Sequence, residues 1–367
     1  VVIAIIGILA SLILVALGGP NALFLNDGGG RFSEQGADAG LTSSAGSTTI
    51  AVADVDGDGW LDMYITNYRA YTMLDRISPQ ERSFDQVVRE VGPRRFEMRE
   101  RYRHDYKLVD RPDLGGISLG QRADPDFFYR NDGTGRFIRE PIAGNRRFLD
   151  EQGKPLKDEP EDFGLAGMFA DLDGDAAPDL YVANDFEDPD QFWKNDGRGN
   201  FRLMPWYAVR STSNSGMAVA VGDVNGDGLP DLFEADMLSR DTRRLKTQVP
   251  THTAIPKQPG LGDGRPQMQR NTLQLNRGDG TFAEIARFAG VGASGWSWST
   301  LFLDVDLDGR EDLLIGTGHR WDVMDGDTQY RLRNRLQQID WRRMLFEYPP
   351  LPLPNVAFRN RGDLTFE

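Results

Sequence analysis

Four short segments of the 367-residue chain carry aspartates at the same relative positions. In the first segment Asp54, Asp56 and Asp58 take positions 1, 3 and 5, Gly59 takes position 6 and Asp62 takes position 9. Alternate carboxylates on a tight turn converge on one point, and glycine permits the sharp bend. Because hard oxygen ligands in this number favour calcium, the spacing predicts a Ca²⁺ site. The main-chain carbonyl of Trp60 and a bidentate Asp62 would complete six or seven oxygens.

The other three segments repeat this pattern with single departures, so we predict up to four Ca²⁺ ions. Ala176 replaces the glycine of the second segment, which predicts a strained bend and a weaker site. Leu307 stands at position 4 of the fourth segment. The first and third segments therefore rank as the most secure sites. The predicted ligands in these three segments are Asp171, Asp173, Asp175 and Asp179; Asp223, Asn225, Asp227 and Asp231; and Asp304, Asp306, Asp308 and Asp312.

Two other interpretations of these segments must be weighed. Aspartate–glycine turns without an ion are one, but several carboxylates in one turn repel each other by several kcal/mol. An EF-hand is the other, and it requires a glutamate at position 12 and flanking helices. Position 12 of the first segment is Ile65, and the residues that follow, such as LDMYITN, alternate as in a strand. The segments therefore predict loops that join two strands.

A second pattern, an apolar strand followed by Asn-Asp-Gly or Asn-Arg-Gly, occurs five times. This chemistry is typical of a hairpin, because asparagine and glycine tolerate positive φ. The hairpin asparagine precedes the first aspartate of the next acidic segment by 28 residues in three cases and by 40 in the fourth. The shortest repeat is 52 residues, about the length of a four-stranded propeller blade. The fold class expected is all-β, a β-propeller of four-stranded blades.

The D-x-D-x-D-G-x-x-D loop between strands, in repeats of this length, resembles the FG-GAP repeats of integrin α-subunits and the bacterial VCBS repeats. The resemblance extends to the bacterial relatives of cartilage acidic protein, which join VCBS repeats to an ASPIC/UnbV domain. That domain is missing here, and the chain stops within the fifth hairpin, so we expect further sequence beyond residue 367. What the resemblance implies is a calcium-binding propeller over residues 21–367.

Residues 1–20 hold an uncharged apolar run that ends at Gly18, Gly19 and Pro20. At 17 residues the run is near the lower limit for spanning a bilayer, and it predicts an apolar helix acting as an export signal or membrane anchor. The run VVIAIIGILASLIL resembles the N-terminal helix of type IV prepilins. It lacks their basic leader and early glutamate and does not begin with Met, so we expect residues upstream. We therefore expect export to the cell surface, periplasm or exterior.

Composition excludes several classes of function. The formal net charge of −14 should repel nucleic acid and anionic lipid, so we expect no nucleic-acid partner, and contact with a membrane only through the N-terminal segment. The chain has no cysteine, which removes disulfides and thiol chemistry. No nucleophile elbow, P-loop or zinc motif occurs.

Three long excursions, 69–122, 238–268 and 317–354, interrupt the repeats as helical or irregular insertions. Long loops in a compact repeat are often functional, so a binding face is expected there. The leading hypothesis is a non-enzymatic adhesion, ligand-binding or scaffold module for a protein or glycan. One alternative is a propeller-based hydrolase or lyase, which would need an acid, a base and a nucleophile in one pocket. Another is a pilin-like filament subunit with a propeller head.

Overall fold

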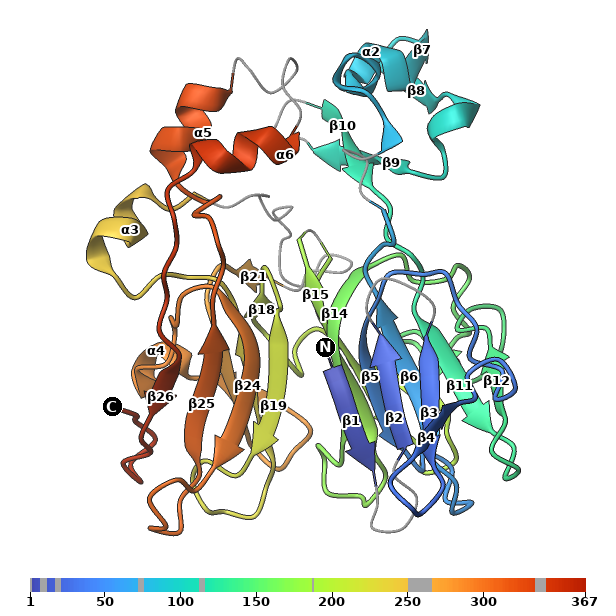
Figure 1. The fold of residues 1–367 in the computed structure, drawn as a ribbon, viewed down its shortest axis with the longest axis vertical. Helices are drawn as coiled ribbons and strands as arrows, with labels where there is room; N and C mark the ends of the chain where they lie inside the picture. Colours follow the sequence, from blue (N-terminus) through green and yellow to red (C-terminus); the bar gives the residue numbers. More distant parts are fainter. Residues whose placement is uncertain are drawn as a thin grey trace.

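The computed structural model describes residues 2–6, 12–16, 21–71, 76–111, 116–186, 188–249, 266–333 and 341–367. It is mostly β and arranges four blades in a propeller (Figure 1), which confirms the fold class that the sequence predicts. The first blade contains β5 (Ser47–Ala53), β6 (Asp62–Asn67), β11 (Phe127–Asn131) and β12 (Phe137–Glu140). The second contains β14 (Phe163–Ala170), β15 (Asp179–Asp185), β16 (Gln191–Asn195), β17 (Phe201–Leu203) and the short β13 (Phe148–Leu149).

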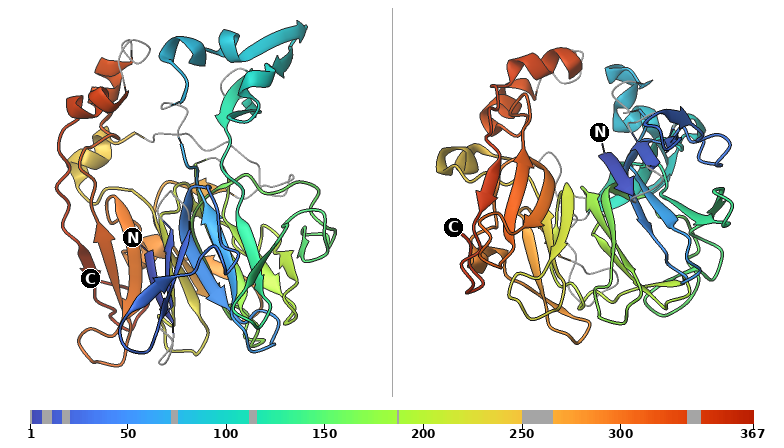
Figure 2. Two further views of the ribbon diagram at one scale, coloured as in Figure 1. Left: turned by 45° about the vertical axis from the view of Figure 1, so that its right-hand side comes forward. Right: turned by 60° about the horizontal axis from the view of Figure 1, so that its bottom comes forward.

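The last two blades follow the same order from the centre outward. The third contains β19 (Ala218–Gly222), β20 (Asp231–Ala235), β22 (Thr272–Asn276) and β23 (Phe282–Glu284). The fourth contains β24 (Ser297–Leu303), β25 (Asp312–Thr317) and β26 (Val356–Phe358). The first strands of the blades, β5, β14, β19 and β24, pack in chain order around the centre (Figure 2).

Each blade buries apolar side chains against its neighbours, because successive residues of a strand point to opposite faces. Between the first and second blades this core is rich in aromatic rings, with Phe148 stacked on Phe201 at 5.0 Å between ring centroids. Trp193 meets Phe148 edge to face at 5.4 Å. Smaller side chains such as Ala220 and Ala235 fill much of the core between the third and fourth blades. These cores fix how the acidic loops of successive blades are placed.

The prediction of a single apolar helix over residues 1–17 is wrong for the residues that the structure describes there. Residues Val2–Ile6 form β1 and residues Leu12–Ala16 form β2, an antiparallel pair. Strand β2 also pairs with β3 (Ala22–Asn26), which pairs with β4 (Phe32–Glu34) in one four-stranded sheet. Valine and isoleucine are frequent in both segments and favour strands, and pairing with β3 satisfies backbone groups that an isolated helix would satisfy internally. Residues 1, 7–11 and 17–20 lie outside the described part, and the assignment of 1–20 as an export segment stays a prediction.

The insertions follow the second strand of a blade and therefore lie at the end opposite the acidic loops (Figure 1). The first has two hairpins of its own, β7 (Val88–Gly92) with β8 (Arg95–Met98), and β9 (Tyr106–Arg111) with β10 (Gly116–Gln121). It also has its own small core, which includes Val87, Met98 and Tyr102. Its short helices are η1 (Pro79–Arg82), α2 (Phe84–Val87) and η2 (Glu100–Tyr102).

The other insertions contain short helices and one small pairing. They carry α3 (Thr242–Thr247), α5 (Gly326–Leu332), α6 (Trp341–Met344) and η4 (Leu345–Glu347), while α4 (Ala286–Ala289) follows β23. Strand β18 (Thr212–Ser213) pairs in parallel with β21 (Gln267–Met268). Among the described residues, no helix has the length and apolar composition needed to cross a bilayer.

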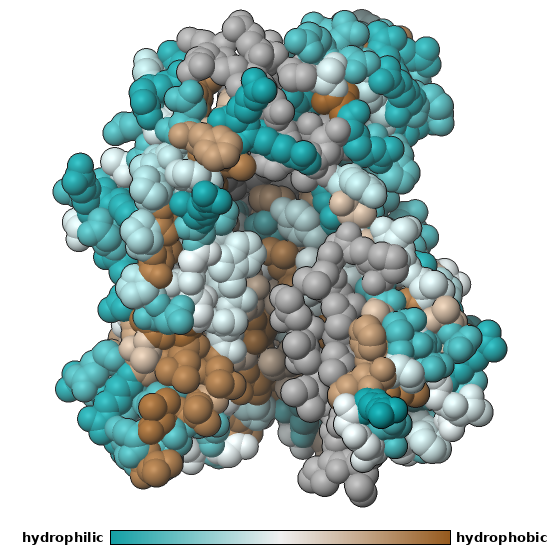
Figure 3. Space-filling model, viewed as in Figure 1, coloured by the Kyte–Doolittle hydropathy of each residue, from teal (hydrophilic) through white to brown (hydrophobic). Residues whose placement is uncertain are grey.

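One face of β24 carries an exposed apolar row. Leu301, Leu303 and Val305 are each about half exposed, at 53%, 49% and 54%. Leu301 and Leu303 alternate along the strand and so point to one side, and Val305 follows in the acidic loop; Figure 3 shows an apolar surface over the lower part of the fourth blade. No described element of the chain covers this row.

Candidate metal centres

Each acidic segment forms the loop between the first and second strand of its blade, as predicted. The first aspartate of each loop folds the turn: Asp54 Oδ1 accepts hydrogen bonds from the backbone N–H of Gly57 and Asp58, and Oδ2 accepts one from Gly59. Asp171 and Asp223 accept the same three bonds in their loops, and Asp304 accepts two of the three. A carboxylate oxygen with one N–H donor keeps a lone pair for a metal.

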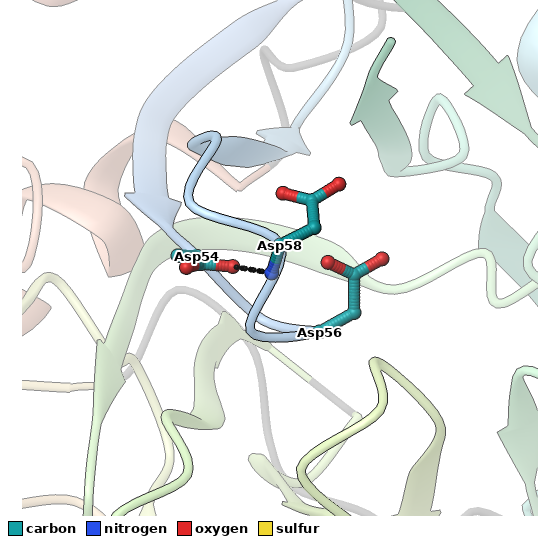
Figure 4. A group of neighbouring side chains, drawn as sticks. All are labelled: Asp54, Asp56 and Asp58. Atoms are coloured by element: carbon teal, nitrogen blue, oxygen red, sulfur yellow. Dashed lines mark hydrogen bonds between the residues drawn. The ribbon is translucent and has the colours of Figure 1, made fainter. Parts of the chain in front are cut away.

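The first loop brings three carboxylates together. One oxygen from each of Asp54, Asp56 and Asp58 lies within 4.8 Å of the others. In Figure 4 the Asp56 and Asp58 carboxylates lie on the same side of the turn, while Asp54 accepts the backbone N–H of Asp58. Asp56 Oδ1 and Asp62 Oδ2 are buried and have no hydrogen-bond partner. Unpartnered anionic oxygens beside a carboxylate cluster fit a hard cation.

Trp60 contributes to the first loop through its backbone atoms. Its N–H donates to Asp58 Oδ1 at 2.8 Å, which leaves its carbonyl, the atom predicted as a ligand, outside that contact. The indole ring is half exposed and lies against Gly133 of the neighbouring hairpin.

The aspartate at position 9 is the first residue of the second strand and is buried in every loop. Its Oδ1 accepts the backbone N–H of the hairpin asparagine at 2.8 Å in all four blades, as from Asn131 to Asp62. Burial, and next in order the contacts with the other loop aspartates, raise the pKa of Asp62 and of Asp231 to about 6. The same causes raise the pKa of Asp179 to about 7. Burial and the neighbouring carboxylates thus disfavour the charged form of these carboxyls, and a cation in the loop would favour it.

The second loop already contains a cation from the protein. The Lys194 ammonium group, on β16, contacts Asp173 and Asp175, and these carboxylates raise its pKa. Asp171, Asp173 and Asp179 have carboxylate oxygens within 4.8 Å of one another. Ala176 has a φ of 67°, a left-handed conformation that costs an alanine about 1–2 kcal/mol, so the strain expected there is present.

The third and fourth loops differ in whether a basic side chain contacts their carboxylates. In the third, Asn225 donates its amide to Asp227 at 2.8 Å, and no basic side chain contacts the loop among the described residues. In the fourth, Asp304, Asp306 and Asp308 form a third close triad. Arg359 contacts Asp306 at 2.7 Å and Arg310 contacts Asp308. Within the described part of the chain, the carboxylates of the first and third loops thus contact no lysine or arginine, while basic side chains neutralise those of the second and fourth loops in part.

The hairpin asparagines have a role that the sequence did not reveal. The side-chain amide of Asn195 donates to Pro178 O in its own acidic loop and to Val55 O in the loop of the preceding blade, at 3.1 and 2.9 Å. Asn276 and Asn360 make the equivalent pairs of bonds. Each amide therefore ties two acidic loops together across a blade boundary. Only the recurrence of asparagine at this hairpin position pointed to such a role.

A second acidic group, which sequence reasoning missed, is buried at the insertion end of the second and third blades. Asp190 accepts hydrogen bonds from the Tyr181 hydroxyl at 2.9 Å and from the Asn184 N–H. Glu234 Oε1 is buried without a hydrogen-bond partner, and burial, followed by the charge of Asp190, raises the pKa of Glu234 well above its usual value. Asp236, also fully buried, accepts the Ser213 hydroxyl at 2.6 Å.

Antiparallel blades around a common centre, each with an aspartate-rich loop at the same end, define a β-propeller with acidic inter-strand loops. The model of the FG-GAP-like repeat matches residues 12–65, 171–233 and 261–315. The chain is therefore an FG-GAP repeat β-propeller protein. No curated protein matches the chain.

Several solved structures are similar to the chain at low identity. One is a lectin from Agrocybe aegerita that specifically recognises non-reducing terminal N-acetylglucosamine: 15% identity, TM-score 0.35, with 100% of this chain and 78% of the lectin covered. Another is the NanB sialidase from Streptococcus pneumoniae: 10% identity, TM-score 0.36, with 85% of this chain and 55% of the sialidase covered. The V. cholerae biofilm matrix protein Bap1 matches at 14% identity and TM-score 0.27, with 74% and 35% covered. At TM-scores below 0.5 these similarities carry no argument about function.

Proposed function

We propose that this protein is an exported, calcium-stabilised propeller that acts without catalysis as a binding or scaffold module, with a protein or glycan partner at the cell surface. An FG-GAP propeller fold suggests a ligand-binding or scaffold module. The observation that carries the calcium part of the proposal is the first loop, where three carboxylates converge and two buried carboxylate oxygens have no partner.

Calcium in these loops would supply the positive charge that the clustered aspartates lack. Asp54, Asp56, Asp58 and Asp62 would hold the ion in the first loop, and Asp223, Asn225, Asp227 and Asp231 in the third. Lys194 and Arg359 would have to move aside in the second and fourth loops, so we expect these two to bind calcium more weakly.

The division of the molecule into two ends supports a structural role for the metal. The acidic loops lie at one end of the blades, and the insertions lie at the other (Figure 1). A partner that binds the insertions would not touch the ions. Calcium should therefore act on stability, and on partner binding only through the fold.

Thermal unfolding with calcium and with EGTA tests the proposal. Ions that bind only the native state stabilise it by about 2.7 kcal/mol at a hundred times the dissociation constant. Asp56→Asn is the sharpest variant, because Asp56 Oδ1 has no hydrogen-bond partner to lose. It should lower the number of bound calcium ions in calorimetry by one and reduce the calcium-dependent gain in melting temperature, with no loss of stability in EGTA.

The matched control is Asp38→Asn, which removes the same charge from an exposed position outside the acidic loops. It should leave the calcium titration unchanged. Equal melting temperatures in calcium and in EGTA would contradict the metal assignment. Export is tested separately: the tagged full-length protein should be recovered from the cell surface, periplasm or medium, and recovery only from the cytoplasm would contradict it.

A further inference from the structure

A cavity of about 710 Å³ lies where the first insertion meets the first blade, at the end away from the acidic loops. Six separate stretches of the chain contribute to it: the segment before β5, the two ends of the insertion, the insertion itself, the outer strand β12 and the segment before β14. The volume is within the range of sites for small ligands, about 300–1,000 Å³. Its charged and hydroxyl-bearing residues are Thr42, Ser43, Ser44, Arg69, Tyr71, Arg76, Arg103, His104, Asp105, Arg122, Asp124, Arg139 and Glu161.

The charge of this cavity opposes that of the whole protein. Its lining has five arginines and three carboxylates, an excess of two positive charges, in a chain with a formal net charge of −14. Three of the arginines are paired: Arg76 with Asp105 at 2.9 Å, Arg103 with Glu100 at 2.9 Å, and Arg122 with Glu161.

Arg69 and Arg139 have no carboxylate partner among the described residues. Arg69 donates to two neutral oxygens, Gln121 Oε1 and Arg122 O, and its buried Nε has no partner. Arg139 is exposed, and its guanidinium lies 3.6 Å from the centre of the Phe127 ring. Stacking of this kind fixes the plane of the guanidinium while leaving its N–H groups available.

We propose that this cavity binds an anionic sugar, with Arg69 and Arg139 pairing with its carboxylate or sulfate group. The planar guanidinium matches both groups with two parallel hydrogen bonds. The hydroxyls of Thr42, Ser43 and Ser44, on one side of the cavity, offer donors and acceptors for ring hydroxyls. A carboxylated and a sulfated sugar share this chemistry. The assignment rests on the proposed function, to which it adds a site and a class of ligand.

Calorimetry on the full chain in calcium, with three small probes, tests the proposal. Digalacturonate and glucose 6-sulfate should bind, and neutral cellobiose should not. The relative affinities of the first two identify the anionic group. Arg139→Gln should weaken binding by about tenfold to a hundredfold, the range expected for lost hydrogen bonds to a charged group.

Arg136→Gln is the matched control, because Arg136 is exposed in the same hairpin and does not line the cavity. It should bind the probes as the unchanged protein does. Arg69→Lys keeps the charge but loses the planar fork, and it should also weaken binding, with the melting temperature checked in parallel. Equal binding of cellobiose, or full affinity in Arg139→Gln, would overturn the proposal. If hexaglutamate bound as tightly as the sugars, the anionic-sugar proposal would be wrong and the site would instead fit an acidic protein partner.

The site and the proposed function can fail separately. If no anionic probe bound but melting depended on calcium, the result would refute only the anionic-sugar site. If binding depended on Arg139 but the melting temperatures in calcium and in EGTA were equal, the result would support the site and refute the calcium proposal.

Discussion

The aspartates of each loop have different structural roles, although the sequence alone does not distinguish them. Asp54 and its equivalents fold the turn through backbone N–H groups, while Asp62 and its equivalents join the second strand to the hairpin of the third. Asp56 and Asp58 are left as the most available ligands. Loss of the position 9 carboxylate would therefore disturb the blade even without metal, whereas loss of Asp56 would affect only the ion.

The buried Glu234 predicts how stability changes with pH. Its pKa is raised in the folded protein, so the native state keeps a proton that the unfolded chain releases near its usual pKa. The native state then binds more protons, and stability falls as the pH rises from about 4.5 through the folded pKa. Glu234→Gln removes this group while keeping its shape. We expect the variant to be more stable than the unchanged protein at pH 8, by about 1 kcal/mol or more, with the difference vanishing near pH 4.

Urea unfolding at several pH values measures this difference. Asp190, Asp185 and Asp236 also have raised pKa values, so the variant should retain a shallower pH dependence of its own. Glu90→Gln, at an exposed position, is the control and should follow the unchanged protein. Parallel curves for Glu234→Gln and the unchanged protein would refute the assignment.

At the scale of the elements, the hairpin asparagines connect the blades. Asn195→Ala would remove three bonds within its blade, one to Pro178 O and two from the Gly197 and Gly199 N–H groups. It would also remove the bond to Val55 O of the preceding blade. We expect a loss of about 2–4 kcal/mol in unfolding free energy. Among the described residues the Asn131 side chain bonds only within its own blade: it donates to Leu61 O at 3.2 Å and accepts the Gly133 N–H at 3.0 Å. We therefore expect Asn131→Ala to cost about 1–2 kcal/mol.

Chemical denaturation of the two variants, in calcium and in EGTA, makes the comparison. The Asn195 loss should persist in EGTA, since its bonds involve backbone carbonyls and no ion. Equal losses in Asn131→Ala and Asn195→Ala would argue against a bond between blades.

At the scale of the whole molecule, the first insertion is a separate unit placed on the propeller. Its ends meet where Asp124 N donates to Tyr68 O at 2.9 Å, and its core is distinct from that of the first blade. Replacing residues 71–121 with a short Gly-Ser linker should therefore leave the propeller folded, because closing such a gap costs little. The free energy by which calcium stabilises the propeller should change by no more than about 1 kcal/mol. Binding of anionic sugars should weaken, because one wall of the cavity is removed.

Melting of this shortened chain, followed by circular dichroism, checks the first expectation, and calorimetry with digalacturonate checks the second. A shortened chain that no longer melts cooperatively would show that the insertion supports the propeller.

The sequence by itself determined the local features of this protein. The D-x-D-x-D-G spacing and the Asn-Asp-Gly turns specify strand–loop–strand and hairpin units, since neighbours within ten residues decide both. Their repetition was enough to predict the propeller, its four acidic loops and the residues that form them. The strain at Ala176 also followed from residue type, because only glycine adopts the left-handed conformation without cost.

Only the tertiary structure decided which residues distant in the sequence contact each loop and hairpin. Lys194 reaches Asp173 across 21 residues, and Asn195 reaches Val55 across 140. The apolar run at residues 1–17 suited a helix or strands equally by composition, and pairing with β3 selected strands for its described parts. The arginine-lined cavity forms because folding brings together six separate segments. Such contacts depend on how the blades pack, and no spacing within one segment encodes them.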